Sequence, residues 1–445
     1  MRTYYLRSFG CQMNEHDAER IRALLEERGL APVAEPDGAD VLVYNTCTVR
    51  KSADDRLAGH LGTAARLKRE DPGRIVLVTG CLPQAEQEGF FRRFPFVDGA
   101  LGPQNLHRLG DLLEAPAAAG PHGYFEDGPA MSGDLAARRA RPFQAWVQIM
   151  SGCTNHCSYC IVPYVRGPER SRPVDDILTE VRALVEDGVR EVTLLGQNVN
   201  SYGLDLDRAT RRASASAAFP ALLRSLDAVD GLERIRFMTS HPKDFSDELV
   251  ATIAESPSVC EHVHLPAQAG SDRILAAMRR GYTAVWLLDR VRALRAAVPG
   301  VSVTTDLIAG FPGETEQEFV QTLDLVETAA FDASFTFVFS PRRGTGAAGL
   351  PGQLSAGVKR ERVERLIAVT QQLALESRQA WVGRRAEVLI EGASRDGRHL
   401  RGRSRQNVTV NVDGAAEPGA IVEAEVTAAT STTLRGKVVS ATSRR

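Results

Sequence analysis

The 445-residue sequence predicts an α/β protein in three parts: a doubly wound parallel sheet, a central open (β/α)6 partial barrel, and a small C-terminal β-barrel. Two successive alternations of apolar strands with amphipathic helices predict the first two parts, because such alternation is typical of parallel sheets. Short strands separated by turns over residues 382–445 predict the third part.

Each of the three strands expected near the N-terminus ends at a cysteine. The expected strands are Thr3–Phe9, Val41–Thr46 and Arg74–Thr79. They end at Cys11, Cys47 and Cys81, which we call the N-terminal triad. Ligands of open α/β sheets bind at the carboxyl ends of the strands, so we expect these thiols to converge on one metal site. Three unrelated buried thiols are the alternative interpretation.

The segment at 115–141 is rich in Ala, Pro and Gly and keeps no apolar period, which predicts a linker. Alternation returns at Pro142. The expected domains are therefore an N-terminal domain at 1–116, a linker at 117–141, a central domain at 142–378 and a C-terminal domain at 379–445.

The central alternation predicts a second set of parallel strands. They are Phe143–Met150, Glu191–Gly196, Arg234–Thr239, His262–Gln268, Val301–Ala309 and Ala333–Ser340. Helical segments such as Asp175–Glu186 and Glu316–Thr328 lie between them. Six strand–helix units indicate an open relative of the eight-stranded barrel. The active sites of such barrels lie at the carboxyl ends of the strands.

Three cysteines follow the first central strand with the spacing C-x3-C-x2-C: Cys153, Cys157 and Cys160, which we call the central triad. A 4Fe–4S cube has four irons, so three thiolates leave one iron without a protein ligand. That iron can bind the amino and carboxylate groups of S-adenosylmethionine, whose sulfonium splits on one-electron reduction to give a carbon radical. A zinc site with a further ligand elsewhere is the alternative. Zinc motifs usually pair C-x2-C with a second distant pair, and the C-x3-C-x2-C spacing does not fit that pattern.

The other central strands end in polar and Gly-rich stretches. They are Gly196-Gln197-Asn198, Ser240-His241-Pro242-Lys243, Gln268-Ala269-Gly270-Ser271 and Ile308-Ala309-Gly310. Glycines let a ligand approach the backbone, and amide and hydroxyl side chains orient its polar groups. Because strand–loop–helix turns use glycine routinely, the alternative for any single stretch is an ordinary turn.

The tail from Val382 carries an excess of basic residues. Lys and Arg number 11 against 7 Asp and Glu, a net charge of +4. The basic residues crowd at Arg398, Arg401, Arg403 and Arg405. A basic patch on a small β-barrel is typical of nucleic-acid binding, and a solvated loop without a partner is the alternative.

Composition excludes several classes of protein. The net charge of −2 argues against a generic polyanion binder, and no run approaches the roughly 18 apolar residues of a membrane span. The N-terminus has no charged-then-apolar leader, so a cytoplasmic protein is expected.

Clustered cysteines in cytoplasmic proteins are typical of metal ligands rather than disulfides. Cys260 lies outside both triads, and we expect it to be a buried structural thiol.

Short motifs along essentially the whole chain carry a resemblance to a known family. They are Gly10–Glu15, Asn45–Cys47, Thr79–Cys81, Ser151–Arg172, Met238–Pro242 and Gly310–Thr315. The chain resembles the methylthiotransferases, a family of radical S-adenosylmethionine enzymes, and its last domain resembles TRAM, an RNA-binding barrel. Gln12 and Met13 resemble the branch of the family that acts on isopentenyl-adenosine in tRNA.

The resemblance implies a transferase of tRNA processing that methylthiolates C2 of N6-isopentenyladenosine at position 37, next to the anticodon. It implies two 4Fe–4S clusters, a radical-generating one on the central triad and an auxiliary one on the N-terminal triad. S-adenosylmethionine would be both radical source and methyl donor. The implied partners are tRNA and an electron-donor protein such as flavodoxin or ferredoxin, with no membrane, and a monomer is expected.

By the same resemblance, S-adenosylmethionine binds along the ends of the central strands. The residues expected to contact it are Tyr159, Gly196, Gln197, Ser240, Gln268, Ile308 and Gly310. Two alternatives stay open for the function. One is the same chemistry on threonylcarbamoyladenosine or on a ribosomal-protein aspartate, and the other is a non-catalytic iron–sulfur protein that binds RNA.

Overall fold

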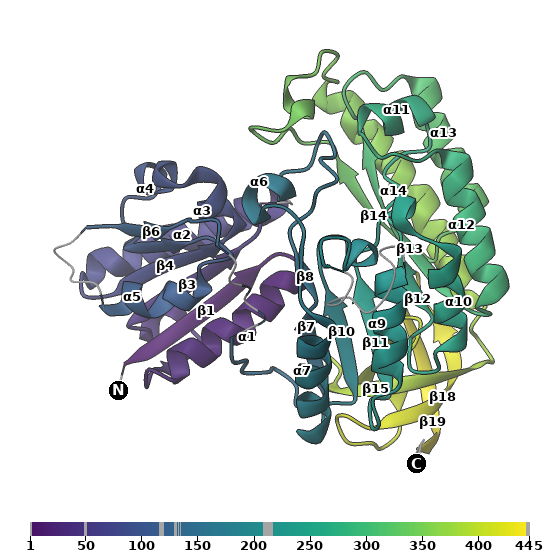
Figure 1. The fold of residues 1–445 in the computed structure, drawn as a ribbon, viewed down its shortest axis with the longest axis horizontal. Coiled ribbons are helices and arrows are strands. Elements are labelled where there is room, and N and C mark those ends of the chain that lie inside the picture. The colour runs from purple at the N-terminus through teal and green to yellow at the C-terminus, as the bar shows by residue number, and fades with distance from the viewer. Residues whose placement is uncertain are drawn as a thin grey trace.

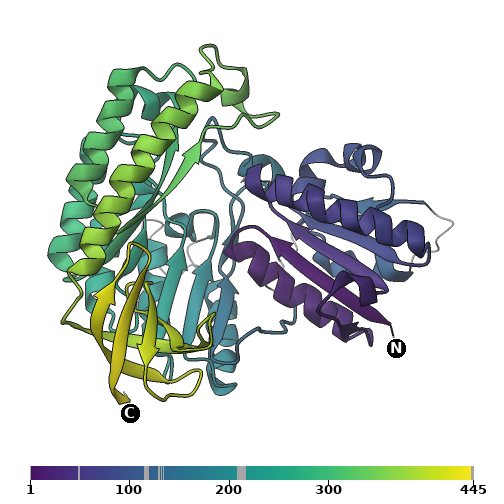
Figure 2. The same cartoon turned by 180° about the vertical axis from the view of Figure 1, so that it is seen from behind.

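The computed structural model describes residues 2–48, 51–114, 120–128, 131, 133, 135–207 and 217–441, without the side chains of 51–55 and 441. The N-terminal sheet stands beside the central barrel, and the C-terminal barrel lies under one end of the central strands (Figure 1). Seen from behind, the long helix α14 (Ala356–Gln379) leads from the central domain to the C-terminal barrel (Figure 2). No helix in the described part of the chain is long and apolar enough to cross a membrane.

The N-terminal domain is a parallel sheet with helices on both faces, as predicted. The strand order is β2-β1-β3-β4-β5-β6, with β1 at Thr3–Phe9, β2 at Ala31–Pro32, β3 at Val41–Thr46, β4 at Ile75–Gly80 and β5 at Gly99–Leu101. The helices are α1 (Gln12–Glu26), α2 (Lys51–Glu70), α3 (Cys81–Glu86), α4 (Glu88–Arg93) and α5 (Leu109–Glu114). Successive strand residues point to opposite faces. One apolar cluster therefore packs against α1 and α5, and another against α2 and α4.

The segment predicted as a linker contains a strand of this sheet, which corrects that part of the prediction. β6 (His122–Tyr124) pairs in parallel with β5, and the Arg108 guanidinium lies 3.9 Å from the centroid of the Tyr124 ring. A three-residue strand with a glycine at its centre has no apolar period, so the sequence pattern cannot reveal it. The domain limits themselves stay a prediction.

The central strands form an open barrel, as predicted. The parallel sheets β7-β10-β11 and β12-β13-β14 are joined at their seam by a bridge between Ile235 and Val259. Their bounds are β7 Gln144–Gln148, β10 Glu191–Leu195, β11 Arg234–Met238, β12 His262–His264, β13 Ser302–Ala309 and β14 Ala333–Val338. The outside is covered by α7 (Val174–Glu186), α9 (Ala218–Asp227), α10 (Asp247–Glu255), α12 (Ala284–Ala297), α13 (Glu316–Ala329) and α14.

All six central strands are shorter than predicted, and the difference is largest for β7 and β12. After β7, Met150–Ser151 separates as β8 and pairs antiparallel with β9 (Arg170–Ser171), with helix α6 (Val162–Arg166) between them. β12 ends at His264 because Pro266 has no amide hydrogen for the ladder. Both changes fall at the carboxyl end of the barrel, where the chain leaves the sheet to form loops.

The C-terminal domain is a closed barrel in the order β15-β16-β17-β19-β18, as predicted. Its strands are β15 (Arg385–Ala393), β16 (Leu400–Ser404), β17 (Thr409–Asp413), β18 (Ile421–Ala429) and β19 (Thr433–Ala441). Strand β16, where the basic patch lies, has no hydrophobic pattern in the sequence. Its inward positions Gly402 and Ser404 are buried but not apolar, so the strand shows no hydrophobic alternation.

Buried arginines join the two barrels at the amino ends of the central strands. Arg234 is fully buried and donates to the Arg403 carbonyl at 2.9 Å and to Glu387 Oε1 at 3.0 Å. Arg236 donates to the Ser404 and Arg405 carbonyls, both at 2.8 Å. The C-terminal barrel therefore closes the end of the central barrel that is opposite to the cysteine loops.

Candidate functional site

The cysteines of the N-terminal triad lie at one edge of the sheet, directly after β1, β3 and β4. Buried polar side chains tie these strand ends together. Asn14 Nδ2 donates to Asn45 Oδ1 at 3.2 Å and to the Thr46 carbonyl at 3.1 Å, and Thr79 Oγ1 also donates to Asn45 Oδ1. At Gly80, where φ is +103°, an added Cβ would lie 2.1 Å from the Thr46 carbonyl oxygen. Only glycine lets β4 approach β3 this closely before its cysteine.

A positive charge polarises the thiols of the N-terminal triad. A hydrogen bond from Cys47 lowers the pKa of Cys11 to about 6 against the effect of burial, and the charge of Arg166 lowers it further. Burial raises the pKa of Cys81, and Arg166 partly offsets that rise. Because the thiolate is the form that binds metal, Arg166 favours the ligand form of both cysteines.

The central triad lies in the loop between β8 and α6. The Cys153 amide donates to the Gly167 carbonyl at 3.1 Å, which closes the loop on itself. At Gly152, where φ is +80°, an added Cβ would lie 1.9 Å from the Pro168 carbonyl oxygen, so this closure needs glycine. The loop is thereby fixed to the segment that follows α6.

Arg280 contacts the central triad from the loop that follows α11 (Asp272–Ala277). It is 5% exposed and donates to Cys157 Sγ at 3.4 Å and to the Pro266 carbonyl at 2.8 Å. Burial raises the pKa of Cys153 to about 11 and that of Cys160 to about 12. These thiols are protonated at neutral pH, so a metal that binds them must displace their protons.

Each triad offers three thiols, which suits an iron–sulfur cube whose thiolates each bind a different iron. Among the described residues, no group of three His, Cys, Asp or Glu side chains is placed to hold a single ion. The donor set, three thiols per site next to a buried cation, is that of an anionic cluster.

Unpaired buried oxygen atoms lie at the ends of two central strands. Ser240 Oγ and Gln268 Oε1 have no hydrogen-bond partner among the described residues, although both side chains are buried. A buried polar atom without a partner is costly, so a site for a polar ligand is indicated here. Both residues were expected from the sequence to contact S-adenosylmethionine.

The structure also brings the two apolar members of the expected cofactor site together. Tyr159 and Ile308 pack against the same buried cluster, which includes Phe311 and Phe339. Gly310 has φ +79°, and its amide donates to Glu314 Oε2 at 2.9 Å. The apolar residues that were expected at the adenine end of the site therefore lie together.

Gly196 and Gln197, the remaining members, lie at the end of β10 beside the cysteine loop. Gln197 Oε1 accepts a hydrogen bond from the Gly152 amide at 2.6 Å. An added Cβ at Gly196 would meet the Met150 side chain at 2.5 Å. Gln197 therefore supports the cysteine loop in this structure, a role that the sequence did not predict.

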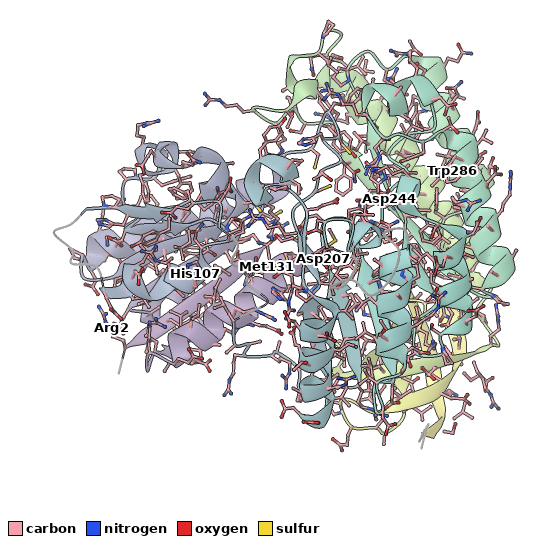
Figure 3. All side chains as sticks on the ribbon, viewed as in Figure 1. Arg2, His107, Met131, Asp207, Asp244 and Trp286 are labelled. Atoms are coloured by element: carbon pink, nitrogen blue, oxygen red, sulfur yellow. The ribbon has the colours of Figure 1, made fainter. Side chains whose placement is uncertain are left out.

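A cavity of about 440 Å³ lies where the three domains meet. Its walls include Gln12 of α1, Trp146 of β7, Met238 of β11, His262 of β12 and Arg401 of β16. Figure 3 shows Met131 where the N-terminal domain meets the barrel. Gln12 Nε2 lies 3.2 Å from Met238 Sδ, so the residue directly after the first cysteine reaches the barrel strands.

The four arginines expected to bind RNA differ in their surroundings. Arg398 is exposed, and the Arg401 side chain is 43% exposed with Glu391 Oε2 at 3.8 Å. Arg403 pairs with Glu391 Oε1 at 3.1 Å. Arg405 is mostly buried and donates to Glu261 Oε2 at 2.7 Å and to the Pro257 and Val259 carbonyls. Arg405 therefore holds the C-terminal barrel on the central one, which revises the expectation that it faces a phosphate.

The sequence analysis missed the charged residues that support both triads. Arg166, Arg280 and Asp17 are brought to the cysteines by packing between segments that are far apart in the chain. Their burial was not readable from charge patterns. Arg166 lies within the motif Ser151–Arg172, close in sequence to the central triad, and this is the one signal in the sequence that points to it.

Known families match each part of the chain. The Radical SAM superfamily matches residues 147–326, the uncharacterized protein family UPF0004 matches 3–102, and the TRAM domain matches 379–439. A tRNA-2-methylthio-N(6)-dimethylallyladenosine synthase of Moorella thermoacetica is 46% identical over an alignment of 445 positions that covers 98% of each chain. One of Desulforamulus reducens is 45% identical over 98% of this chain and 95% of its own. The chain belongs to this synthase family.

Family membership makes this chain a radical S-adenosylmethionine enzyme with 4Fe–4S chemistry, and the zinc interpretation is set aside. Among solved structures, the radical S-adenosylmethionine methyltransferase TsrM from Kitasatospora setae, with cobalamin and a [4Fe-4S] cluster bound, has a TM-score of 0.56. The match covers 78% of this chain and 77% of that one at 14% identity, and it shows the shared fold alone.

Proposed function

We propose that the protein methylthiolates C2 of N6-isopentenyladenosine at position 37 of tRNA, next to the anticodon. The observation that supports the proposal most strongly is the 46% identity, over 98% of both chains, to a tRNA-2-methylthio-N(6)-dimethylallyladenosine synthase. The C2–H bond is neither acidic nor electrophilic enough for acid–base or nucleophilic side chains, so cofactors must carry the chemistry. When bound, S-adenosylmethionine and the cluster on the central triad would supply the radical, a second S-adenosylmethionine would supply the methyl group, and the cluster on the N-terminal triad would hold the sulfur that is transferred.

The chain's own residues hold these groups in the proposal. The central triad holds one 4Fe–4S cluster and the N-terminal triad a second, in agreement with three thiols at each site. Ser240 and Gln268 orient the polar end of S-adenosylmethionine, because the unpaired oxygens of these two side chains need partners. Gly196 and Gln197 lie at the same end of the ligand. Tyr159, Ile308 and Gly310 receive its adenine.

The substrate base enters the cavity at the junction of the three domains in this proposal. Anticodon-loop bases can be splayed out and stacked on aromatic side chains, and Trp146 offers such a surface beside Gln12. Arg398 and Arg401 are the arginines left to meet phosphates. A flavodoxin or ferredoxin delivers electrons, and the protein acts as a monomer in the cytoplasm.

The proposal is tested by offering reconstituted enzyme prenylated and unprenylated anticodon stem-loops, with mass analysis of the nucleosides. Methylthiolation should occur on the prenylated stem-loop and be weak on the other. Replacing the central triad with Ala should abolish cleavage of S-adenosylmethionine. Replacing the N-terminal triad should spare cleavage but stop methylthiolation. Equal reaction of both stem-loops, or reaction of only a threonylcarbamoyl form, would contradict the substrate assignment.

A further inference from the structure

Arg166 is a buried cation between the two triads. It is the last residue of α6, six residues after Cys160, and is 5% exposed. Its side chain points to the N-terminal domain, where its positive charge acts on the thiols of Cys81 and Cys11. Its Nη2 lies 3.5 Å from Asp17 Oδ2 on α1.

The backbone next to Arg166 contacts the central triad. The Gly167 carbonyl accepts the hydrogen bond from the Cys153 amide at 3.1 Å. The Arg166 carbonyl accepts one from Gln104 Nε2 of the N-terminal domain at 2.9 Å. Two consecutive residues therefore connect the triads, because the charge of Arg166 acts on the thiols of one triad and the Gly167 carbonyl accepts from a cysteine amide of the other.

Burial strengthens the electrostatic effect of this charge. Ile161 and Val165, on the same turn of chain, pack against Cys81 and exclude water from the contact. A buried guanidinium is stable only with anionic partners, and its Coulomb interactions are weakly screened there. The Asp17 carboxylate is one such partner, and thiolates or an anionic cluster on the N-terminal triad supply the rest.

We propose that Arg166 is a positioning residue that sets the reduction potential of the cluster on the N-terminal triad and fixes that triad to the loop of the central triad. The inference rests on the proposed function, because it assumes a cluster at the N-terminal triad. Charged groups and hydrogen bonds around a cluster are known determinants of its potential.

The sign of the effect follows from charge. Reduction adds a negative charge to the cluster, which a neighbouring guanidinium stabilises. Arg166→Met should therefore shift the midpoint potential to more negative values, and Arg166→Lys should restore part of the shift. Asp17→Asn removes a negative charge from the same site and should shift the potential in the opposite direction.

The experiment uses the full-length chain with the three cysteines of the central triad replaced by Ala, so that one cluster remains. After anaerobic reconstitution, iron and sulfide per chain are counted and the potential is measured by redox titration with electron paramagnetic resonance. Arg20→Met is the matched control: Arg20 is also a buried arginine of this interface, but it pairs with Glu19 and Glu180 at 3.8 Å. It should leave the potential unchanged.

The outcomes separate the inference from the proposed function. If the starting protein binds no cluster, the cluster assignment itself fails, and the inference fails with it. If it binds one and Arg166→Met leaves the potential unchanged, or shifts it in the same direction as Asp17→Asn, the inference alone is overturned. Loss of the cluster in Arg166→Met but not in Arg166→Lys supports the role of the charge. Loss in both, with native circular dichroism, overturns it.

Discussion

At the scale of single residues, Ser240 and Gln268 keep unpaired oxygen atoms in buried positions at the rim of the barrel. Such atoms cost free energy in the ligand-free protein and favour the ligand-bound one. Ser240→Ala and Gln268→Met should therefore leave the free energy of unfolding of the ligand-free protein unchanged or slightly raised. Each should weaken binding of S-adenosylmethionine to the reconstituted protein by about 3- to 10-fold, as expected for the removal of a hydrogen bond of about 1 kcal/mol.

A second serine provides the control for this prediction. Ser302 Oγ is also buried without a partner among the described residues, but it lies at the amino end of β13, away from the triads. Ser302→Ala should change neither stability nor binding, as measured by urea unfolding and equilibrium dialysis. Equal loss of binding in Ser302→Ala would show that the effect is not local to the rim.

Residue types and spacing were enough to find both triads, because thiols at strand ends have a chemical signature in the sequence. The residues that hold them were not found. Asn14, Arg166 and Arg280 act through contacts across the fold, and a buried arginine looks like a surface arginine until its neighbours are known.

At the scale of elements, helix α14 supports the loop of Gly310 through a buried ion pair. Arg362 Nη1 donates to Glu314 Oε2 at 2.8 Å, and the same oxygen accepts from the Gly310 amide. Arg362→Met leaves this carboxylate buried without its cation, which should cost about 3–5 kcal/mol of unfolding free energy. Binding of S-adenosylmethionine should weaken as well, because the loop loses its anchor.

Arg365 is the matched control on the same helix. Its side chain is 39% exposed and pairs with Glu316 and Glu361 at the surface. Arg365→Met should cost about 0–1 kcal/mol. Urea unfolding of both variants checks the prediction, and a loss from Arg365→Met as large as that from Arg362→Met would contradict it.

Helix α13 begins with a capping box. Thr315 and Glu318 bond reciprocally, and Arg273 holds the pKa of Glu318 down at about 2. A folded pKa below the ordinary value of about 4.3 stabilises the protein above that pH, and the contribution is lost as the pH falls through 2. Glu318→Gln should cost about 1 kcal/mol at pH 7 and less at pH 3.

Glu327 on the same helix is exposed and serves as the comparison. Glu327→Gln should change urea stability little at either pH. If the loss from Glu318→Gln were the same at pH 3 as at pH 7, the ionised capping box would not be its cause. The predicted helix Glu316–Thr328 and α13 begin at the same residue, next to a capping box that is local in sequence, whereas the Arg362–Glu314 pair spans the fold.

At the scale of the whole molecule, the order of the three domains was predictable, but their contacts were not. The alternating patterns predicted β1 and β3 with the bounds observed. The seam between the barrels depends instead on Arg234 and Arg236 bonding to backbone carbonyls of the C-terminal barrel. Carbonyl groups carry no sequence signature, so no pattern of residues could reveal this docking. The seam also means that deleting residues 382–445 would expose buried arginines of the central barrel.

Point substitutions therefore separate RNA binding from docking. Removing one arginine that neutralises a phosphate should reduce the slope of log affinity against log salt by roughly 0.7 for single-stranded RNA. The double variant Arg398→Gln with Arg401→Gln should thus bind tRNA more weakly and with a smaller slope, at nearly unchanged stability. Arg405→Gln should keep the slope and instead lower the free energy of unfolding by about 1.5–3 kcal/mol, because its bonds to Glu261 stabilise the seam. Filter binding over a range of salt, with urea unfolding alongside, measures both quantities. A reduced slope in Arg405→Gln with none in the double variant would place the RNA surface at the seam.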